Sequence, residues 1–260
     1  MRRRLTWRRD GVCGSAPAGN RGLMSRVIVP GVVEMLFPRA LVHAYIVWAD
    51  VPTLIDTGTP GAAKTLITAL EVSDLRPEDI GRIVLTHAHA DHAGNAAQLA
   101  QLSGAEVHVS PGTAPFVRAG REQPRPQAAT PLGKLMVPYV KAALPWRVEQ
   151  VEVRETLVEG AMVGPFRVLE TPGHQAGHVS LLWEARGVLF TGDAAANITA
   201  LGPHPAADDP QLQSASFERL GREAFETACF GHGRAVSAGA AGRFRATATA
   251  TAPAPAPAAA

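Results

Sequence analysis

The sequence predicts an α/β protein in which two packed β-sheets are flanked by helices. Runs rich in β-branched and aromatic residues alternate with helix-forming segments along the 260-residue chain. Their order is strands, helices, more strands, one helix and a final strand. Each half of this order begins with strands, and each half places histidine or aspartate in loops that follow strand ends. That arrangement fits two sheets packed against each other with helices outside.

The first half of the expected fold consists of strands and two helices. Strands are predicted at residues 27–29, 32–37, 42–48 and 51–55, separated by proline and glycine. A helix is expected at 61–71, followed by a buried strand at 83–85, a helix near 95–102 and a strand at 106–109. His108 lies among the apolar residues of that last strand, so we expect it to be structural and not a ligand.

The second half follows a long loop at residues 120–131, which is rich in Pro, Arg and Gln. Apolar residues at helical spacing predict a helix at 132–144, kinked at Pro138, that either covers the sheet or forms a wall of the substrate cleft. A second β-layer is predicted from strands at 148–153, 156–158 and 166–169 and from a hairpin at 178–183 and 187–190. A helix at 217–227 and a final strand at 229–230 complete the order.

The length and composition indicate one globular domain at residues 25–245. Residues 1–24 are rich in Arg, Gly and Ala, and we expect a disordered extension or a true start at Met24; a basic arm for nucleic acid is the alternative. Residues 246–260 alternate Ala with Thr and Pro and are expected to be a disordered tail.

Charge, cysteine content and hydropathy argue against several classes of function. The net charge of +2 is too small to indicate a nucleic-acid partner. Of the two cysteines, Cys13 lies outside the predicted domain, so we expect no disulfide and a cytoplasmic protein. No apolar run approaches the ~18 residues of a membrane span, and no signal-peptide core follows the N-terminal arginines. We therefore expect a small-molecule substrate, with no nucleic-acid or membrane partner.

The segment THAHADHAG at residues 86–94 follows the predicted strand at 83–85 and places His87, His89, Asp91 and His92 within six positions. Imidazole and carboxylate together suit Zn²⁺ and similar metals. His87 and His89 alternate, so both lie on one side of an extended segment and can reach one ion. Asp91 and His92 leave that alternation and can face a second ion. A His-rich surface loop is the alternative, which the further histidines and aspartates at strand ends disfavour.

Five motifs in this order resemble those of the metallo-β-lactamase-fold hydrolases, including glyoxalase II and lactonase-like members. They are LIDTG at 54–58, THAHADHAG at 86–94, TPGHQAGH at 171–178, FTGD at 190–193 and FGHG at 230–233. The resemblance covers residues 27–236. It implies a four-layer αβ/βα sandwich, in which two mixed β-sheets are flanked by helices.

The resemblance also implies a binuclear metal site. One ion is expected to be bound by His87, His89 and His174, and the second by Asp91, His92 and His232. Asp193 is expected to bridge the two ions beside a bridging water or hydroxide. His178 is expected to support the site without binding metal. Asp56 is expected to do the same, or to form an Asx-turn or cap the helix at 61–71, and Cys229 is expected to be a core residue.

The function implied by this site is hydrolysis in which the bridging hydroxide attacks a small ester, thioester or lactone. Both ions are expected to be zinc, with iron or manganese as alternatives. Asp91 is the expected catalytic residue, which manages the proton after the hydroxide attacks. β-Lactamase activity is disfavoured, because lactam-hydrolysing members often use Cys where this chain has Asp. About forty residues separate Asp193 from His232, and the chain stops soon afterwards, so large inserted or C-terminal domains are not expected.

Three other functions remain open. They are a mononuclear iron oxidoreductase of the persulfide-dioxygenase type, a phosphodiesterase or nuclease, and a metal-binding relic without activity. The complete set of ligands favours hydrolysis over the first and the last, and the low net charge argues against nucleic acid. The segment 197–209, which holds His204 between two prolines, either lines the cleft or is a solvated loop.

Overall fold

The computed structural model describes residues 25–251 except 39, 125–126, 129–130, 132–133, 136–137 and 139–146. The predictions for residues 1–24, 132–144 and 252–260 fall wholly or largely outside this part of the chain. Within it, the chain forms two main sheets and two small two-stranded sheets. The small sheets pair β13 (Ala195–Asn197) with β14 (Leu201–Pro203), and β15 (Ala206–Ala207) with β7 (Gln127–Ala128).

The first main sheet has seven strands in the order β1-β2-β3-β4-β5-β6-β8. They are β1 (Ser25–Val29), β2 (Val32–Phe37), β3 (Val42–Trp48), β4 (Pro52–Ile55), β5 (Arg82–Val84), β6 (Glu106–Val109) and β8 (Arg154–Glu155). The pairs β1–β2, β2–β3 and β3–β4 are antiparallel, whereas β4, β5, β6 and β8 are parallel to one another. Asp56 follows β4 and the segment 86–94 follows β5, so both leave the same edge of this sheet.

The second main sheet has five strands in the order β16-β12-β11-β10-β9. They are β9 (Met162–Val163), β10 (Phe166–Glu170), β11 (Val179–Trp183), β12 (Val188–Phe190) and β16 (Thr227–Cys229). Strands β10, β12 and β16 run in one direction, because β11 is antiparallel to both β10 and β12, and β12 is parallel to β16. The loops that hold His174, Asp193 and His232 therefore leave one edge of this sheet.

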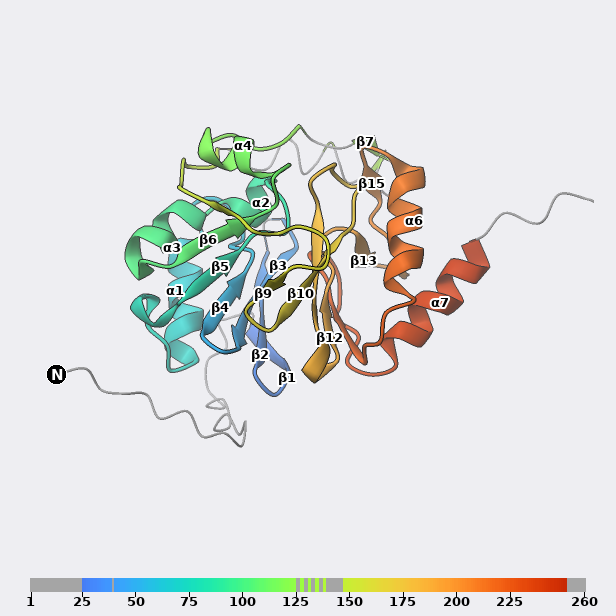
Figure 1. Ribbon diagram of the computed structural model, residues 1–260, viewed down its shortest axis with the longest axis horizontal. Coiled ribbons are helices and arrows are strands. Elements are labelled where there is room, and N and C mark those ends of the chain that lie inside the picture. The colour runs from blue at the N-terminus through green and yellow to red at the C-terminus, as the bar shows by residue number, and fades with distance from the viewer. Residues whose placement is uncertain are drawn as a thin grey trace, which may run out of the picture.

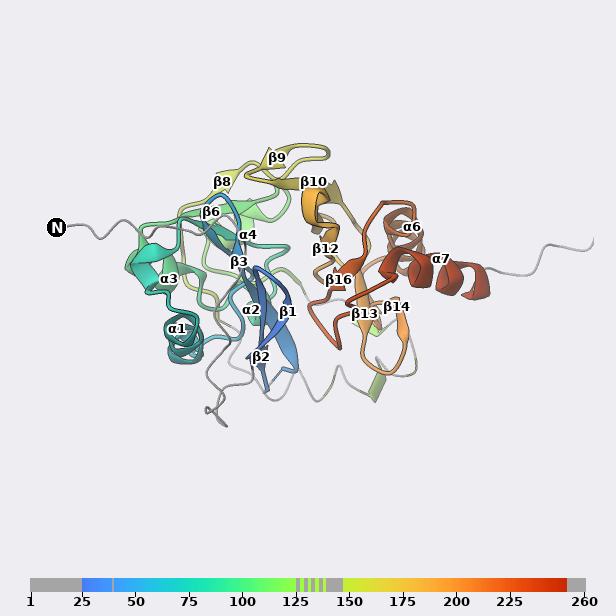
Figure 2. The same cartoon turned by 90° about the horizontal axis from the view of Figure 1, so that it is seen from below.

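Helices lie outside the two main sheets. On one side are α1 (Ala63–Val72) and α3 (Ala96–Ser103), and on the other are α6 (Pro210–Leu220) and α7 (Ala240–Thr251) (Figure 1). Figure 2 shows the same succession of layers from a perpendicular direction. The remaining short helices are η1 (Pro77–Asp79), α2 (Ala90–Ala93), α4 (Ala114–Arg118) and η2 (Glu184–Arg186). The predicted four-layer αβ/βα sandwich is confirmed.

Three buried apolar clusters fill the spaces between the four layers. The first cluster joins the first sheet to α1 and α3, the second lies between the sheets, and the third joins the second sheet to α6 and α7. Neighbouring residues of one strand enter different clusters: Leu181 faces the first sheet, and Leu182 faces the helices. Successive side chains of a strand point to opposite faces, so a strand buried on both faces is apolar throughout.

The strand prediction for residues 148–153 is wrong. Val148 and Val153 are buried against the first cluster, but this segment pairs with no sheet. The two residues that follow form β8, which pairs with β6 in the first sheet and not in the second layer. Leu157, in the segment predicted as a strand at 156–158, is buried between the sheets, although that segment also forms no strand. An apolar residue that lies in a loop can also be buried, so hydrophobicity alone did not distinguish these loop segments from strands.

The helix predicted at 217–227 begins and ends seven residues earlier, as α6 at Pro210–Leu220. Its start is set by Asp209, whose side chain accepts hydrogen bonds from the backbone N–H groups of Gln211 and Leu212 at 3.0 and 2.9 Å. Pro210 occupies the first helical position, where its missing N–H costs nothing. The Asp-Pro pair was the signal for this helix start.

The predicted boundary after residue 245 falls inside α7, which continues to Thr251. Phe244 of this helix is fully buried against the second sheet, and Ala248 packs on the same cluster. Alanine has the highest helix propensity, so the Ala/Thr alternation at 246–251 continues the helix and is no tail. Among the described helices, none has the length and apolar character to span a bilayer.

Candidate metal centre

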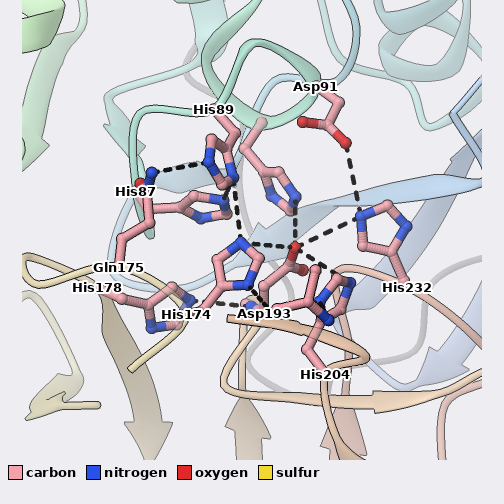
Figure 3. Close-up of polar contacts among 12 residues, drawn as sticks. His87, His89, Asp91, His174, Gln175, His178, Asp193, His204 and His232 are labelled. Carbon is pink, nitrogen blue, oxygen red and sulfur yellow. Dashed lines mark hydrogen bonds and ion pairs between the residues drawn. The ribbon is translucent and has the colours of Figure 1, made fainter. Parts of the chain in front are cut away.

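The predicted ligands converge from loops at the edges of both main sheets (Figure 3). His87, His89, Asp91 and His92 follow β5, with the last two in the short helix α2. His174, Asp193 and His232 follow β10, β12 and β16. All seven are buried, with at most 8% of any of these residues exposed. The structure thus brings together every residue predicted to bind metal.

The first donor set consists of His87, His89 and His174. Nδ1 of His89 lies 2.9 Å from Nε2 of His87 and 3.1 Å from Nε2 of His174. Three ring nitrogens therefore point toward a common centre. The alternation of His87 and His89 along the sequence predicted that these two rings would face the same ion.

The second donor set consists of Asp91, His92 and His232. Nε2 of His232 lies 3.5 Å from Oδ2 of Asp91. The rings of His92 and His232 have their centroids 5.6 Å apart at an angle of 67°. This set lies beside the first, because the ring of His92 is tilted over that of His87 with centroids 4.2 Å apart.

Asp193 lies between the two sets. Its Oδ2 is 3.4 Å from Nε2 of His174, which belongs to the first set, and 3.5 Å from Nε2 of both His92 and His232, which belong to the second. The backbone N–H of Asp193 donates a hydrogen bond of 2.9 Å to Nε2 of His178. His178 therefore holds Asp193 in place with the ring nitrogen that a metal would need, which agrees with the expectation that it supports the site without binding metal.

The outer ring nitrogen of each of the five histidines in the two donor sets is anchored by the protein, so that the other nitrogen faces the centre of the site. The anchors are Oγ1 of Thr86 for His87 (3.0 Å), Gln175 for His89 (2.7 Å), Oδ2 of Asp56 for His92 (2.8 Å), the carbonyl of Ala206 for His174 (2.8 Å) and the carbonyl of Leu41 for His232 (3.1 Å). The four oxygen partners accept from the outer nitrogen and so fix both the ring orientation and the tautomer that suits metal binding, whereas the amide nitrogen of Gln175 fixes only the orientation of the His89 ring.

Asp56 supports the site and does not cap a helix. Besides His92, its carboxylate accepts hydrogen bonds from the backbone N–H and the hydroxyl of Thr86, at 2.9 and 2.9–3.1 Å. Its backbone φ of 58° lies in the left-handed region, which Asp tolerates better than most residues. The alternative that Asp56 caps the helix at 61–71 is wrong, since the N-cap of α1 is Ala62 and no side chain caps it.

Comparison with known proteins assigns the family. The metallo-beta-lactamase superfamily profile matches residues 39–232, which include all the ligand candidates. This chain belongs to the metallo-beta-lactamase superfamily. The expected fold and family are therefore confirmed.

Three relatives illustrate the range of this metallo-beta-lactamase superfamily. The chain is 33% identical over 150 residues to the hydroxyacylglutathione hydrolase GloC of Haemophilus influenzae, covering 57% of this chain and 64% of that protein. It is 32% identical over 161 residues to the protein YobT of Bacillus subtilis, covering 61% of this chain and 63% of that one. The chain thus spans less than two thirds of the length of these relatives. The crystal structure of TTHA1623 in a di-iron-bound form superposes with a TM-score of 0.55 at 28% identity, covering 75% and 88% of the two chains.

The imidazoles of this superfamily site differ in their affinity for protons. Burial lowers the pKa of His87 and His174 well below the usual value and that of His89 to about 4. Burial also acts to lower the pKa of His92 and His232, but neighbouring carboxylates, Asp193 first among them, outweigh it and raise both. The first set is therefore neutral at neutral pH, which is the form that binds metal.

The two carboxylates are ionised for the complementary reason. Burial acts to raise the pKa of Asp91 and Asp193, but nearby imidazoles, above all His232, outweigh it and hold both values well below the usual range. Both side chains are therefore negative oxygen donors at neutral pH.

The donor set fits divalent metal ions. Nε2 of His92 and Oδ1 of Asp193 are buried and have no hydrogen-bond partner among the described residues. Leaving such atoms unpaired is costly, and a cation coordinated between them would remove that cost. Gly231 leaves the space free, because a Cβ at this position would lie 2.1 Å from Oδ1 of Asp193.

Three further residues behave as the sequence predicted or left open. His108 is half-buried, and its Nδ1 pairs with Oγ1 of Thr156 at 2.9 Å, away from the site. Cys229 is fully buried in the cluster between the sheets, as expected of a core residue. His204, whose role was open, lies in the site: its Nε2 is 3.6 Å from Oδ2 of Asp193.

Sequence reasoning assigned no role to four of the anchors, which are Thr86, Gln175, Ala206 and Leu41. Two of these act through backbone carbonyls, which carry no signal in residue type. Gln175 sits inside the TPGHQAGH motif, and a buried amide beside a ligand histidine was the available signal for its role.

Proposed function

We propose that this chain is a metal-dependent hydrolase that binds two divalent metal ions and cleaves a small ester, thioester or lactone. The observation that carries the proposal is the pair of donor sets that share Asp193. In these sets five imidazoles each turn one anchored nitrogen outward and the other inward, beside two ionised carboxylates. Such an arrangement is costly to a fold unless cations occupy it.

In this proposal His87, His89 and His174 would hold one ion and Asp91, His92 and His232 the other, and Asp193, whose Oδ2 lies within 3.5 Å of nitrogens of both sets, would serve both. Two divalent ions bound there would make a water molecule acidic enough to act as a nucleophile near neutral pH and would polarise the scissile carbonyl. Zinc is the proposed metal, because His and Asp suit it; iron is supported by the di-iron form of TTHA1623. Manganese is the third choice.

The protein's own residues orient the reaction. Asp91 and His232 have side chains that are each 10% exposed, whereas those of His174 and Asp193 are 2 and 3% exposed. A substrate therefore reaches the site from the side of Asp91 and His232. Asp91 is ionised at neutral pH and lies on this more exposed side, so its carboxylate can accept the proton that an attacking water releases, which makes it the proposed catalytic base.

The substrate class rests on the relatives and on the chemistry of the site. A hydrolase named for hydroxyacylglutathione is 33% identical to the chain in the aligned region. The net charge of +2 supports a small molecule over nucleic acid.

Metal analysis and a substrate panel test the proposal. Purified protein dialysed without chelator should carry close to two equivalents of Zn, Fe or Mn per chain. It should also hydrolyse at least one member of a panel of esters, thioesters and lactones in preference to phosphodiesters. A firm value of one metal per chain with full activity contradicts the binuclear site, and turnover of a persulfide with O₂ but of no panel member contradicts hydrolysis.

A further inference from the structure

His204 stands at the mouth of the proposed metal centre without belonging to either donor set of the proposed function. It lies in the turn between β14 and β15, and its side chain is 11% exposed, like those of Asp91 and His232. Its ring centroid is 4.7 Å from that of His174 and 5.2 Å from that of His232. His204 therefore faces a member of each set and lies next to Asp193 (Figure 3).

The position of His204 relative to Asp193 is fixed by one side chain of α6. Nε2 of Gln213 donates hydrogen bonds to the backbone carbonyl of His204 at 3.1 Å and to that of Asp193 at 3.3 Å. Gln213 is 1% exposed, so water does not compete for this amide. This shared hydrogen-bond partner keeps the position of His204 constant relative to Asp193. A group that takes part in a reaction must be held in position in this way.

Ala206 sets the hydrogens on two neighbouring rings. Its carbonyl accepts from Nδ1 of His174 at 2.8 Å, which leaves Nε2 of His174 with a lone pair. Nδ1 of His204 lies 3.2 Å from the backbone N–H of Ala206 and 3.1 Å from the same carbonyl. The carbonyl oxygen has two lone pairs and can accept from both rings, but the N–H of Ala206 can only donate and points at Nδ1 of His204, so we assign Nδ1 of His204 as the acceptor.

Nε2 of His204 therefore carries a hydrogen. The same holds for the protonated ring, in which both nitrogens are donors. The distance of 3.6 Å to Oδ2 of Asp193 is too long for a hydrogen bond, so the Asp193 carboxylate leaves this N–H available at the mouth of the site.

We propose that His204 is a catalytic residue whose Nε2–H donates a hydrogen bond to an oxygen of the substrate's scissile group, and that it binds no metal. This inference rests on the proposed hydrolase function. A donor in a buried site stabilises the negative charge that develops on oxygen during acyl transfer. The competing role is that of a third metal donor together with His174 and Asp193, whose donor atoms lie within 4.8 Å of that of His204.

The variants His204→Ala and His204→Gln separate these two roles. His204→Gln keeps an N–H donor of similar reach, whereas His204→Ala removes it. On 4-nitrophenyl acetate, His204→Ala should lose about 100-fold in kcat/KM, mostly in kcat, because the hydrogen bond strengthens as charge develops. His204→Gln should recover most of that loss. His108→Ala, outside the site, is the matched control and should keep wild-type kinetics.

Metal retention supplies the readout that activity does not. After competition with a chelator, His204→Ala should hold as much metal as the wild type, and the visible absorption spectrum of the Co²⁺-loaded protein should not change. A loss of metal or a changed spectrum identifies His204 as a ligand and overturns the proposal. Unchanged kinetics in His204→Ala overturns it as well.

Acetate binding separates a failure of this inference from a failure of the proposed function. If the wild type hydrolyses no ester, acetate titrated into the Co²⁺-loaded protein still probes the N–H donor. His204→Ala should then bind acetate about tenfold more weakly than the wild type, as expected for a lost hydrogen bond to a charged group. Equal acetate affinity in the two proteins contradicts the donor role whatever the reaction is.

Discussion

Asp193 joins the two donor sets through one oxygen atom. Its Oδ2 lies within 3.5 Å of imidazole nitrogens from both sets, and its backbone is held by His178 and Gln213. No other carboxylate among the described residues has this position. Asp193→Asn keeps the size of the side chain and removes its charge, so the charge that offsets two cations is lost.

Asp193→Asn should therefore bind metal more weakly and hydrolyse more slowly. We expect a loss of at least about 100-fold in kcat/KM, or about 2.7 kcal/mol of transition-state stabilisation. Elemental analysis and steady-state kinetics on the same preparation measure both effects, with His108→Ala as control. Full activity in Asp193→Asn with two metals bound would show that Asp193 does not bridge the ions.

The seven candidate metal donors could be predicted from the sequence, whereas the residues around them, such as His204, could not. Four donors lie within one short segment, and the others follow apolar strands, so spacing and family resemblance located all seven. His204 follows no strand of the main sheets and stands between two prolines. Its proximity to Asp193 depends on Gln213 of another element, which is a tertiary contact that no local pattern encodes.

His43 should make the stability of the metal-free protein depend on pH. It is 8% exposed, and its Nδ1 is buried without a hydrogen-bond partner among the described residues. Burial, followed by the nearby His232, lowers the pKa of His43 to about 4; Arg26 and His92 act in the same direction, and the carbonyl of Gly231 opposes them. Between pH 6.5 and 4 the unfolded chain therefore binds a proton that folded His43 does not, and stability falls as pH falls.

His43→Gln removes this contribution. Between pH 7 and pH 5 the metal-free wild type should lose up to about 2 kcal/mol more unfolding free energy than the variant. Urea denaturation at the two pH values, after removal of metal, gives the comparison. Equal losses in both proteins would mean that His43 takes up its proton in the folded state as readily as in the unfolded one.

At the scale of elements, the loop after β16 depends on the absence of a side chain at Gly231. A Cβ there would lie 2.1 Å from Oδ1 of Asp193 and 2.7 Å from Cε1 of His92. Gly231→Ala should displace both ligands and lower metal content and activity. A loss of about 1–3 kcal/mol in stability is expected from the overpacking.

Gly202→Ala is the matched control for this substitution. Gly202 lies in β14, and a Cβ at this position meets no atom within 4 Å. It should therefore leave metal content, kinetics and melting temperature unchanged. Wild-type metal binding in Gly231→Ala would show that the loop after β16 can move away from Asp193 at no cost.

Helix α7 stabilises the strand that leads to His232. The ring of Phe244 stacks on that of Phe217 in α6 with centroids 4.7 Å apart, and it lies 6.2 Å from that of Phe230, which follows β16. Phe244→Ala should destabilise the protein by about 3–5 kcal/mol, the usual cost of removing a buried phenylalanine. Leu212→Ala, at a position 42% exposed on α6, should cost much less in the same thermal denaturation. Comparable melting temperatures for the two variants would exclude a structural role for α7.

The elements differ in how far the sequence predicted them. Strands β1 to β6 and the hairpin of β11 and β12 follow from period-two or continuous apolar runs between turn residues, and the structure confirms them within two residues. β8 consists of two exposed charged residues, Arg154 and Glu155, and pairs only because the chain passes beside β6. Helix α7 was missed because its Ala/Thr composition resembles a low-complexity tail, although Phe244, together with Ala240 and Ala241, is buried against the second sheet.

At the scale of the whole molecule, the metal centre lies between two halves that also meet through the apolar cluster between the sheets and through hydrogen bonds such as that from Val179 N–H to the carbonyl of Thr86 at 3.1 Å. Four ligands leave the edge of the first sheet, and three leave the edge of the second. Only the first four are close in sequence, so the unfolded chain cannot reproduce the site. Metal that binds only the folded state stabilises it, by about 4 kcal/mol when free metal exceeds its dissociation constant a thousandfold.

Removing the metal should therefore lower the melting temperature by roughly 10 °C, since about 1 kcal/mol shifts it by roughly 2–4 °C in a chain of this size. The measurement is thermal denaturation before and after dialysis against a chelator, with recovery on adding back Zn²⁺. Hydrogen exchange should increase most in the loops after β5, β10, β12 and β16, because these alone lose their shared ligand. Asp193→Asn separates a specific effect from metal bound elsewhere: its melting temperature should respond little to the chelator. An equally large drop in that variant would place the stabilising metal outside the two donor sets.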